Sequence, residues 1–277
     1  MAKVRKDKRG RNLHKGEYQR PDGRYAYAYR YNGKRVFIYD TDLASLRKKE
    51  QQIQADLIDG IRTYESSRLT LNDLFQVYME TKTNLKESTE SNYRYLWEHY
   101  IQHESIAEKA LSKIHKSDVK LLYAKLLQEG FASNSLESIN NLIHPVLELA
   151  VDDDLIRKNP SNGVYRDMKT NAPIQRIALT SEQTQHFLQY IESSPQYCSW
   201  LPLFVTLLGT GMRASECTGL VWDNIDFENN CIHVDHALIY RSLHGNAQWY
   251  ISTLKTRNSA RTIPMISAVA QQLNLLY

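Results

Sequence analysis

The sequence is poor in cysteine and has no long apolar run, and each absence excludes a class of protein. Its three cysteines have neither the density nor the paired spacing of a disulfide scaffold, which is typical of a chain in a reducing compartment. No stretch approaches the apolar length that spans a bilayer. The first sixteen residues carry charges without an apolar block behind them, so they do not form a secretory signal. We therefore expect a cytoplasmic protein with no membrane partner.

Charge is distributed unevenly along the 277 residues, a length that suits two or three domains. The net charge is +4, but residues 1–35 hold 12 Lys and Arg against three acidic residues, whereas the remainder holds 23 basic and 28 acidic residues. A basic end on an otherwise mildly acidic chain indicates a polyanion partner. The alternative is a solvated, disordered basic tail.

Residues 24–31 alternate between tyrosine and Arg or Ala, which predicts a strand with two different faces. Asn32-Gly33 is a hairpin signal, residues 35–39 form the return strand, and a short strand near residues 17–20 completes a three-stranded sheet. A helix over residues 43–61 should cover the tyrosine row, because a lone hairpin is unstable in water. The other face then presents arginines and two aromatic rings to solvent, as in a sheet laid on a DNA groove.

The remaining chain reads as a helical segment followed by a mixed one. Four helices are expected in residues 68–170, with Thr70, Ser88, Ser117 and Ser133 as N-caps, a kink at Pro145 and a linker over residues 159–173. An apolar helix follows at residues 200–208. Short strands are expected near residues 232–234, 237–241, 248–252 and 261–264, before a last helix at residues 269–276.

Two strings resemble the first half of a tyrosine recombinase (phage integrase) catalytic domain. They are LLGTGMRASECTGLVWDNIDF at residues 207–227 and STLKTRNSARTIP at residues 252–264. KGEYQRPDGRYAYAYRYNGKRVFIY, residues 15–39, resembles the arm-site domain of conjugative-transposon integrases. The resemblance implies an α+β multidomain protein: an arm-site DNA-binding sheet at 1–64, a helical core-site DNA-binding bundle at 68–170, and a partial mixed α/β catalytic domain at 175–277.

The resemblance also implies a chemistry and its residues. In this family a tyrosine hydroxyl attacks the scissile phosphate to form a 3′-phosphotyrosine, with no metal or nucleotide cofactor. Arg213 corresponds to the first catalytic arginine, Glu216 to a supporting residue, and Lys255 to the general acid. Double-stranded DNA, at arm and core sites, is the implied partner, with self-association on DNA. The residues expected to contact DNA are Arg20, Arg24, Arg30, Lys34, Arg35, Phe37 and Tyr39.

Each catalytic assignment has an ordinary structural alternative. Arg213 could cap a helix or form a surface ion pair, and Lys255 could be an exposed hairpin lysine. Arg257 and Arg261 could contact phosphate or be solvated. Cys231, His233, Asp235 and His236 are ligand types, but strand alternation splits them between faces, and the ligand spacing of structural zinc is missing. No metal site is therefore predicted.

The departures from the family pattern leave two functional hypotheses. None of the nine histidines has an arginine three positions later, so the family's His-x-x-Arg pair is absent, and Tyr277 comes too early to be the nucleophile. The first hypothesis is a mobile-element integrase whose chain, as given, is C-terminally incomplete and inactive alone. The second is a non-catalytic DNA-binding protein that acts as a repressor or competitor at recombination sites.

Overall fold

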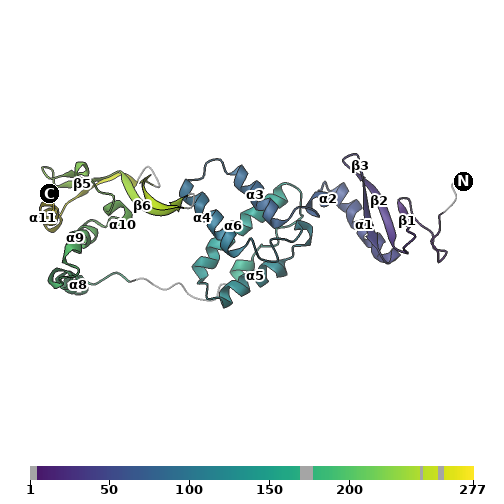
Figure 1. Cartoon of the computed structure of the whole chain (residues 1–277), viewed down its shortest axis with the longest axis horizontal. Coiled ribbons are helices and arrows are strands. Elements are labelled where there is room, and N and C mark those ends of the chain that lie inside the picture. Colours follow the sequence, from purple (N-terminus) through teal and green to yellow (C-terminus); the bar gives the residue numbers. More distant parts are fainter. Residues whose placement is uncertain (1–4, 169–176, 244–245, 255–258) are drawn as a thin grey trace. The chain divides into compact units, whose positions relative to one another are not determined.

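The structure, a computed structural model, describes residues 5–168, 177–243, 246–254 and 259–277 (Figure 1). The chain is a mixed α+β protein, as predicted, and divides into two compact units, Met1–Pro173 and Ile174–Tyr277. Among the helices of the described ranges, none combines the length and the apolar character needed to cross a membrane.

The N-terminal sheet is antiparallel, with strand order β1-β2-β3, and is followed by helix α1. The bounds are Glu17–Gln19 for β1, Tyr25–Tyr31 for β2, Lys34–Asp40 for β3 and Leu43–Ile58 for α1. Both turn residues, Asn32 and Gly33, have positive φ, which confirms the predicted two-residue hairpin. The tyrosine row is buried against α1 as predicted, in a core that contains Tyr25, Tyr27, Tyr29, Leu43, Leu46 and Ile53. Helix α1 ends three residues earlier than predicted, and Gly60 follows with a φ of +79°.

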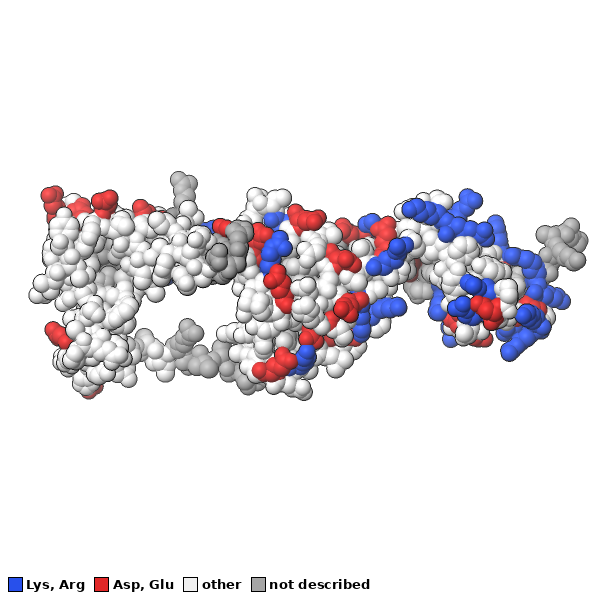
Figure 2. Space-filling model, in the orientation of Figure 1, with Lys and Arg blue, Asp and Glu red and all other residues white. Residues whose placement is uncertain are grey.

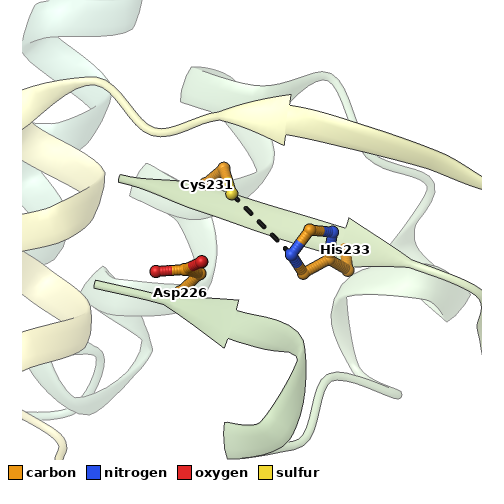
Figure 3. Close-up of side chains that lie close together, drawn as sticks. All are labelled: Asp226, Cys231 and His233. Carbon is orange, nitrogen blue, oxygen red and sulfur yellow. Dashed lines mark hydrogen bonds between the residues drawn. The ribbon is translucent and has the colours of Figure 1, made fainter. Parts of the chain in front are cut away.

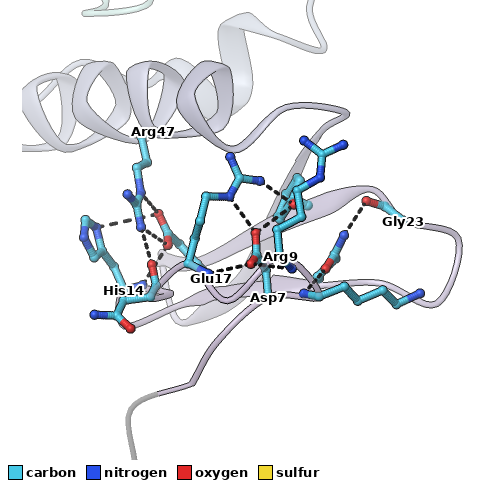
Figure 4. A network of polar contacts seen from close by, with 11 residues as sticks. Asp7, Arg9, His14, Glu17, Gly23 and Arg47 are labelled. Atoms are coloured by element: carbon cyan, nitrogen blue, oxygen red, sulfur yellow. Dashed lines mark hydrogen bonds and ion pairs between the residues drawn. The ribbon is translucent and has the colours of Figure 1, made fainter.

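A polar network holds the N-terminal arm, residues 5–16, against this sheet (Figure 4). The buried carboxylate of Asp7 accepts hydrogen bonds from the backbone and Nε of Arg11, both at 2.8 Å, and from the Tyr25 hydroxyl at 3.0 Å. Burial alone would raise the pKa of Asp7, but these hydrogen bonds outweigh it and lower the pKa to about 2. The arm is therefore folded, which corrects the alternative of a disordered basic tail for residues 5–16.

A second buried carboxylate joins the sheet to helix α1. Glu17, on β1, is fully buried and accepts from Nε and Nη2 of Arg47 at 2.8 and 3.0 Å (Figure 4). This two-pronged pair is the geometry in which Arg–carboxylate bonds are strongest. Sheet and helix therefore share a charged connection beside their apolar one.

The helical bundle follows α1 within the first unit. Its elements are α2 Thr63–Ser66, α3 Leu71–Thr81, α4 Glu87–Tyr100, η1 Leu111–Lys113, α5 Lys116–Gln128, α6 Ser133–Asp152 and α7 Val164–Met168. In its core Phe75 stacks on Trp97, with ring centroids 4.0 Å apart. Thr70 caps α3 in a reciprocal pair with Asp73, as predicted.

The other three N-cap predictions were wrong by one or two residues. The helices begin after Lys86, His115 and Ala132 rather than after the serines. At α5 the carboxylate of Asp118 accepts from the backbone N–H of His115 at 2.9 Å, so an acidic residue in the first turn satisfies the donor that fixes the start. Helix α6 continues through Pro145.

The predicted linker at residues 159–173 is wrong over its described part, which packs into the bundle. Val164, at the start of α7, is fully buried in the bundle core. Asn159 and Ser161 are also buried and bond to each other and to His144, whose Nδ1 lies 2.8 Å from the Ser161 hydroxyl. The proline and glycine in this stretch mark a tight turn inside the bundle rather than a connector between domains.

The second unit surrounds a small core with two separate sheets. Its elements are α8 Ser181–Ser193, η2 Cys198–Trp200, α9 Leu201–Thr210, α10 Ala214–Cys217, η3 Trp222–Asn224, β4 Ile225–Asp226, β5 Cys231–Val234, β6 His236–Leu243, β7 Asn246–Thr253, β8 Arg261–Pro264 and α11 Ser267–Asn274. One sheet has the order β4-β5-β8, and β6 pairs with β7 in a hairpin. Ile232 and Val234 are buried in the core at 0% and 3% exposure, whereas Trp222 and Trp249 are exposed at 43% and 61%.

We predict that limited proteolysis degrades the second unit before the first. The bundle core is large and fully enclosed, whereas the second core is small and has exposed apolar side chains beside it. Local opening is easiest where few apolar contacts must be broken. A time course followed by mass spectrometry should show a persistent fragment that contains residues 5–168. Equal survival of peptides from both units would contradict this prediction.

Candidate functional site

The solvent-exposed face of the N-terminal sheet, here called the sheet face, is the side opposite helix α1. Strand register places on it the side chains of Tyr18, Arg30, Arg35, Phe37 and Tyr39. Arg20 and Arg24 continue the same alternation just beyond the strand ends, where the Arg20 N–H donates to the Arg24 carbonyl at 2.8 Å. Arg30 and Arg35 are directly opposite each other across β2 and β3, and both are exposed. Like charges in directly opposed positions are destabilising. A polyanion bound to this face would relieve that repulsion.

Aromatic rings lie between these arginines. Phe37 and Tyr39 are 38% and 41% exposed, and their rings are stacked with centroids 6.5 Å apart. The guanidinium carbon of Arg20 lies 5.1 Å from the Tyr39 centroid, and that of Arg35 lies 5.1 Å from the Phe37 centroid. These distances are within the range of cation–π attraction, so the rings hold the arginines over the face.

Tyr18 also belongs to the sheet face, although the sequence did not single it out. Its ring meets Phe37 edge-on, with centroids 6.4 Å apart. The residue lies in the predicted first strand, where alternation with the buried Glu17 would have placed it on this side. Lys34, which was expected to contact DNA, has the register of the tyrosine row, because it pairs with Tyr31 at the end of the hairpin.

The arginines of the sheet face differ in how far their charge is compensated. Asp22 accepts from Nε and Nη2 of Arg24 at 3.0 and 2.8 Å and lies 3.3 Å from Nε of Arg20. The Arg24 hydrogen bonds lower the pKa of Asp22, so the carboxylate is ionised at neutral pH. Figure 2 shows Lys and Arg gathered over the N-terminal elements. Elsewhere on the face in view, acidic side chains are more frequent.

A second candidate site centres on Glu216 in the second unit. Its carboxylate is 2% exposed and accepts from Nη1 of Arg213 at 2.7 Å and from Nη2 of Arg261 at 2.8 Å. The Arg213 side chain is 70% exposed, whereas that of Arg261 is 32% exposed. The acid is thus buried beneath an exposed guanidinium whose direction it sets.

Local chain geometry explains this arrangement. Helix α9 ends at Thr210, and Gly211 follows as its C-cap with the left-handed φ of +63°. Arg213 then caps the short helix α10, and its backbone N–H donates to Glu216 at 2.9 Å. Gly209 lets α11 approach α9, because a Cβ there would lie 2.5 Å from Cγ2 of Val269. The Gly-Thr-Gly sequence therefore ends one helix and aims the next arginine.

Glu216 is ionised in this cluster. The hydrogen bond from Arg261 is the main reason that its pKa falls to about 2, with burial opposing and Arg213 assisting the shift. Arg261, which the sequence left undecided between phosphate contact and solvated charge, is an ion-pair partner of Glu216. Lys255 and Arg257 lie outside the described residues.

Two residues of metal-ligand type, Asp235 and His236, contact each other. Nδ1 of His236 lies 2.5 Å from a carboxylate oxygen of Asp235, and its Nε2 lies 2.7 Å from the backbone oxygen of Gly219. Both acceptors favour the doubly protonated ring, and the Asp235 contact chiefly raises the pKa of His236. This pair fastens β6 to the loop after α10.

Tyr277 is exposed at 81% and follows α11. Its ring contacts Trp222 and Phe227, with centroids 5.1 and 5.7 Å away. It is therefore a surface aromatic residue with apolar neighbours.

The chain matches two family descriptions along its length. Residues 1–57 match the DNA binding domain of tn916 integrase, and residues 178–276 match the phage integrase family. Together with the sheet, the bundle and the Arg213 cluster, these matches show that the chain belongs to the tyrosine recombinase family.

Within that family the chain is similar to transposon integrases. It is 29% identical to the transposase from transposon Tn916 of Enterococcus faecalis over 98% of this chain and 69% of that protein. The Tn1549 transposon integrase, solved in complex with a circular intermediate DNA, matches with a TM-score of 0.69 and 26% identity over 75% of this chain and 65% of that one. A lambda integrase tetramer bound to a Holliday junction shares the fold, with a TM-score of 0.54, 18% identity and coverage of 96% and 75%. The chain thus spans about two thirds of the length of its transposon relatives.

We predict that Glu216→Gln lowers the stability of the second unit by about 2 kcal/mol at neutral pH, the scale of lost hydrogen bonds to a charged group. Because the folded-state pKa is depressed to about 2, the carboxylate stabilises fully above its ordinary pKa and loses this effect as the pH falls toward 2. The difference from the parent should therefore shrink between about pH 4.5 and pH 2. Urea unfolding across this pH range measures it.

Glu228→Gln is the matched control, because Glu228 is exposed in the same unit. It should change stability by less than about 0.5 kcal/mol. A difference for Glu216→Gln that stays constant from pH 7 to pH 2 would show that the carboxylate charge is not what stabilises the cluster.

Proposed function

We propose that this chain is a site-specific recombinase of a mobile element that binds double-stranded DNA through its sheet face. The observation that carries the proposal is the opposed pair Arg30 and Arg35, exposed beside two aromatic rings. Guanidinium groups meet phosphates or guanine edges, while flat side chains fill the groove between them. The family membership supports this reading, because residues 1–57 match a DNA-binding domain.

The proposed division of labour has three parts. Residues 1–64 bind arm-type sites, residues 68–170 bind the core site, and residues 175–277 form part of the catalytic domain. The Tn1549 and lambda integrase structures both contain DNA, which supports a DNA partner for this chain. The lambda tetramer supports self-association on DNA as a further part of the proposal.

The proposed strand-exchange residues supply positive charge to a phosphate. Arg213 would bind the non-bridging oxygens through its planar fork, and Glu216 and Arg261 would hold its position. Lys255 would protonate the leaving 5′-oxygen. The 277 residues contain no His-x-x-Arg sequence, so we propose that residues 1–277 by themselves bind DNA without cleaving it. Removal of one positioned donor already costs a factor of about 10²–10³ in rate.

The lack of a His-x-x-Arg sequence within residues 1–277 is equally compatible with a second candidate function. A DNA-binding chain without cleavage chemistry could act as a repressor or as a competitor of an active recombinase at the same sites. The coding DNA downstream of the Tyr277 codon distinguishes the two. An in-frame or shifted His-x-x-Arg followed by a tyrosine supports the recombinase, and their absence supports the competitor.

We predict that the triple substitution of Arg20, Arg24 and Arg30 by alanine flattens the salt dependence of DNA binding. Each phosphate contact contributes roughly −0.9 to the slope of log affinity against log salt. Arg30→Ala and Arg35→Ala should each flatten the slope more than Arg24→Ala, because Asp22 already compensates Arg24. Fluorescence anisotropy with an arm-site duplex across a salt series measures these slopes.

Lys48→Ala is the matched control for this series. Lys48 is exposed on α1, the helix that covers the tyrosine row on the opposite side of the sheet. Its removal changes the net charge as much as each single arginine substitution does, but it should leave the slope unchanged. A triple variant with the parent slope would place the DNA interface elsewhere.

We predict that the 277-residue chain forms no covalent adduct with a nicked suicide substrate that carries a core site. Denaturing electrophoresis with labelled DNA checks this outcome while binding is verified in parallel. An adduct would overturn the proposed lack of cleavage, and its loss in Tyr277→Phe would identify Tyr277 as the nucleophile.

A further inference from the structure

A mixed cluster of metal-ligand side chains lies on the outer face of the β4-β5-β8 sheet. Asp226 on β4 pairs in register with Cys231 on β5, and Cys231 and His233 are two positions apart on the same strand. Residues in these positions project from one face of a sheet. Figure 3 shows the three side chains gathered on these neighbouring strands. One ligand atom from each lies within 4.8 Å of the others.

The distances suit a transition-metal ion. The Cys231 sulfur and Nε2 of His233 are 3.8 Å apart. Two ligands of one tetrahedral zinc, at bond lengths of about 2.3 Å for sulfur and 2.0–2.1 Å for nitrogen, stand about 3.6 Å apart. The Cys–His pair is thus nearly in place, and Asp226 needs to approach by at most about an ångström to complete a three-ligand site at that separation.

Both ends of the cluster are oriented by further hydrogen bonds. Nδ1 of His233 lies 3.0 Å from the hydroxyl of Thr262 on β8, so the other ring nitrogen, Nε2, is the one directed toward Cys231. This is the outer support that metal-binding histidines commonly have. The two oxygens of Asp226 accept from the backbone and side chain of Asn229, each at 2.8 Å, and each oxygen keeps a lone pair for an ion.

We propose that Asp226, Cys231 and His233 bind one divalent transition-metal ion of the zinc class, with water in the fourth position. A thiolate and an imidazole select such ions over magnesium or calcium. The ion would join β4 to β5 and, through Thr262, brace β8. The adjacent β8 residue, Arg261, holds Glu216, so the bound metal would stabilise the strand that supports the Arg213 cluster.

A second group of ligand-type residues, His14, Glu17 and Glu50, is less suited to bind a metal ion. Both oxygens of Glu17 already accept from Arg47, and a guanidinium beside the ligand opposes a cation. Asp235 and His236 are likewise engaged with each other.

Cobalt(II) is the probe for the proposed site, added to tag-free, chelator-treated full chain. We expect one equivalent to give a thiolate-to-cobalt charge-transfer band in the near ultraviolet. Cys231→Ser should abolish the band and His233→Ala should weaken cobalt binding at least tenfold. Thr262→Val, which keeps the strand shape but removes the hydroxyl, should weaken binding by about 10–100-fold. Because ligands must lose protons to bind, affinity should fall as the pH is lowered.

Cys198→Ser is the matched control, because Cys198 is an exposed cysteine outside the cluster, and it should keep the full band. Zinc should raise the melting temperature of the parent and of Cys198→Ser relative to chelator, but not that of Cys231→Ser. Circular dichroism of each variant establishes that it is folded. No band in the parent, a band that survives Cys231→Ser, or one lost in Cys198→Ser would overturn the proposal.

Discussion

The buried carboxylate of Glu216 is the constraint on which the organisation of the second unit depends. It accepts hydrogen bonds from two arginines, Arg213 before α10 and Arg261 on β8. These arginines are 48 residues apart in sequence. An unpaired carboxylate at 2% exposure would be costly, so each arginine is required by the burial of the acid. The pairing in turn leaves Arg213 exposed with a defined direction.

The two basic sites of the chain treat their charge in opposite ways. In the Arg213 cluster a buried acid orients the guanidinium, which is what a site needs when phosphate geometry decides the outcome. On the sheet face, Arg30 and Arg35 are exposed directly across from each other. An aromatic ring supports Arg35, and Arg20 has both the Tyr39 ring and the carboxylate of Asp22 beside it. Such a surface retains its charge for a polyanion. Under the proposed function, affinity and positioning would be provided by different parts of the chain.

The sequence predicted features that arise from short-range periodicity. Alternation in residues 24–31 places the tyrosines against α1 and leaves Phe37 and Tyr39 exposed, because a strand's two faces are fixed by its register alone. Thr70 was a recognisable cap, since its reciprocal partner, Asp73, lies three residues later. The predicted serine caps were wrong where another residue fixes the start of the helix. At α5, for example, the Asp118 carboxylate accepts from the backbone N–H of His115.

Features that depend on distant partners could not be predicted in this way. Turn residues at 159–163 suggested a linker, but Val164 is buried by helices that come earlier in the chain. The burial of Ile232 and Val234 likewise depends on distant elements, because α9 and α11 cover them. Arg261 became interpretable only when β8 brought it to Glu216.

The ligand-type residues on strand β5 also show that sequence periodicity cannot identify partners on a neighbouring strand. Alternation puts His236 on the other face from Cys231 and His233, which argued against a four-ligand site within one strand. It could not reveal Asp226, because a ligand contributed by the neighbouring strand depends on the register of β4 with β5. Since both ligand strands belong to the sheet that contains Arg261, the outer face of this sheet and the Glu216 cluster are mechanically connected through β8. A ligand that fixes one should reduce the motion of the other, whichever ion or phosphate is bound.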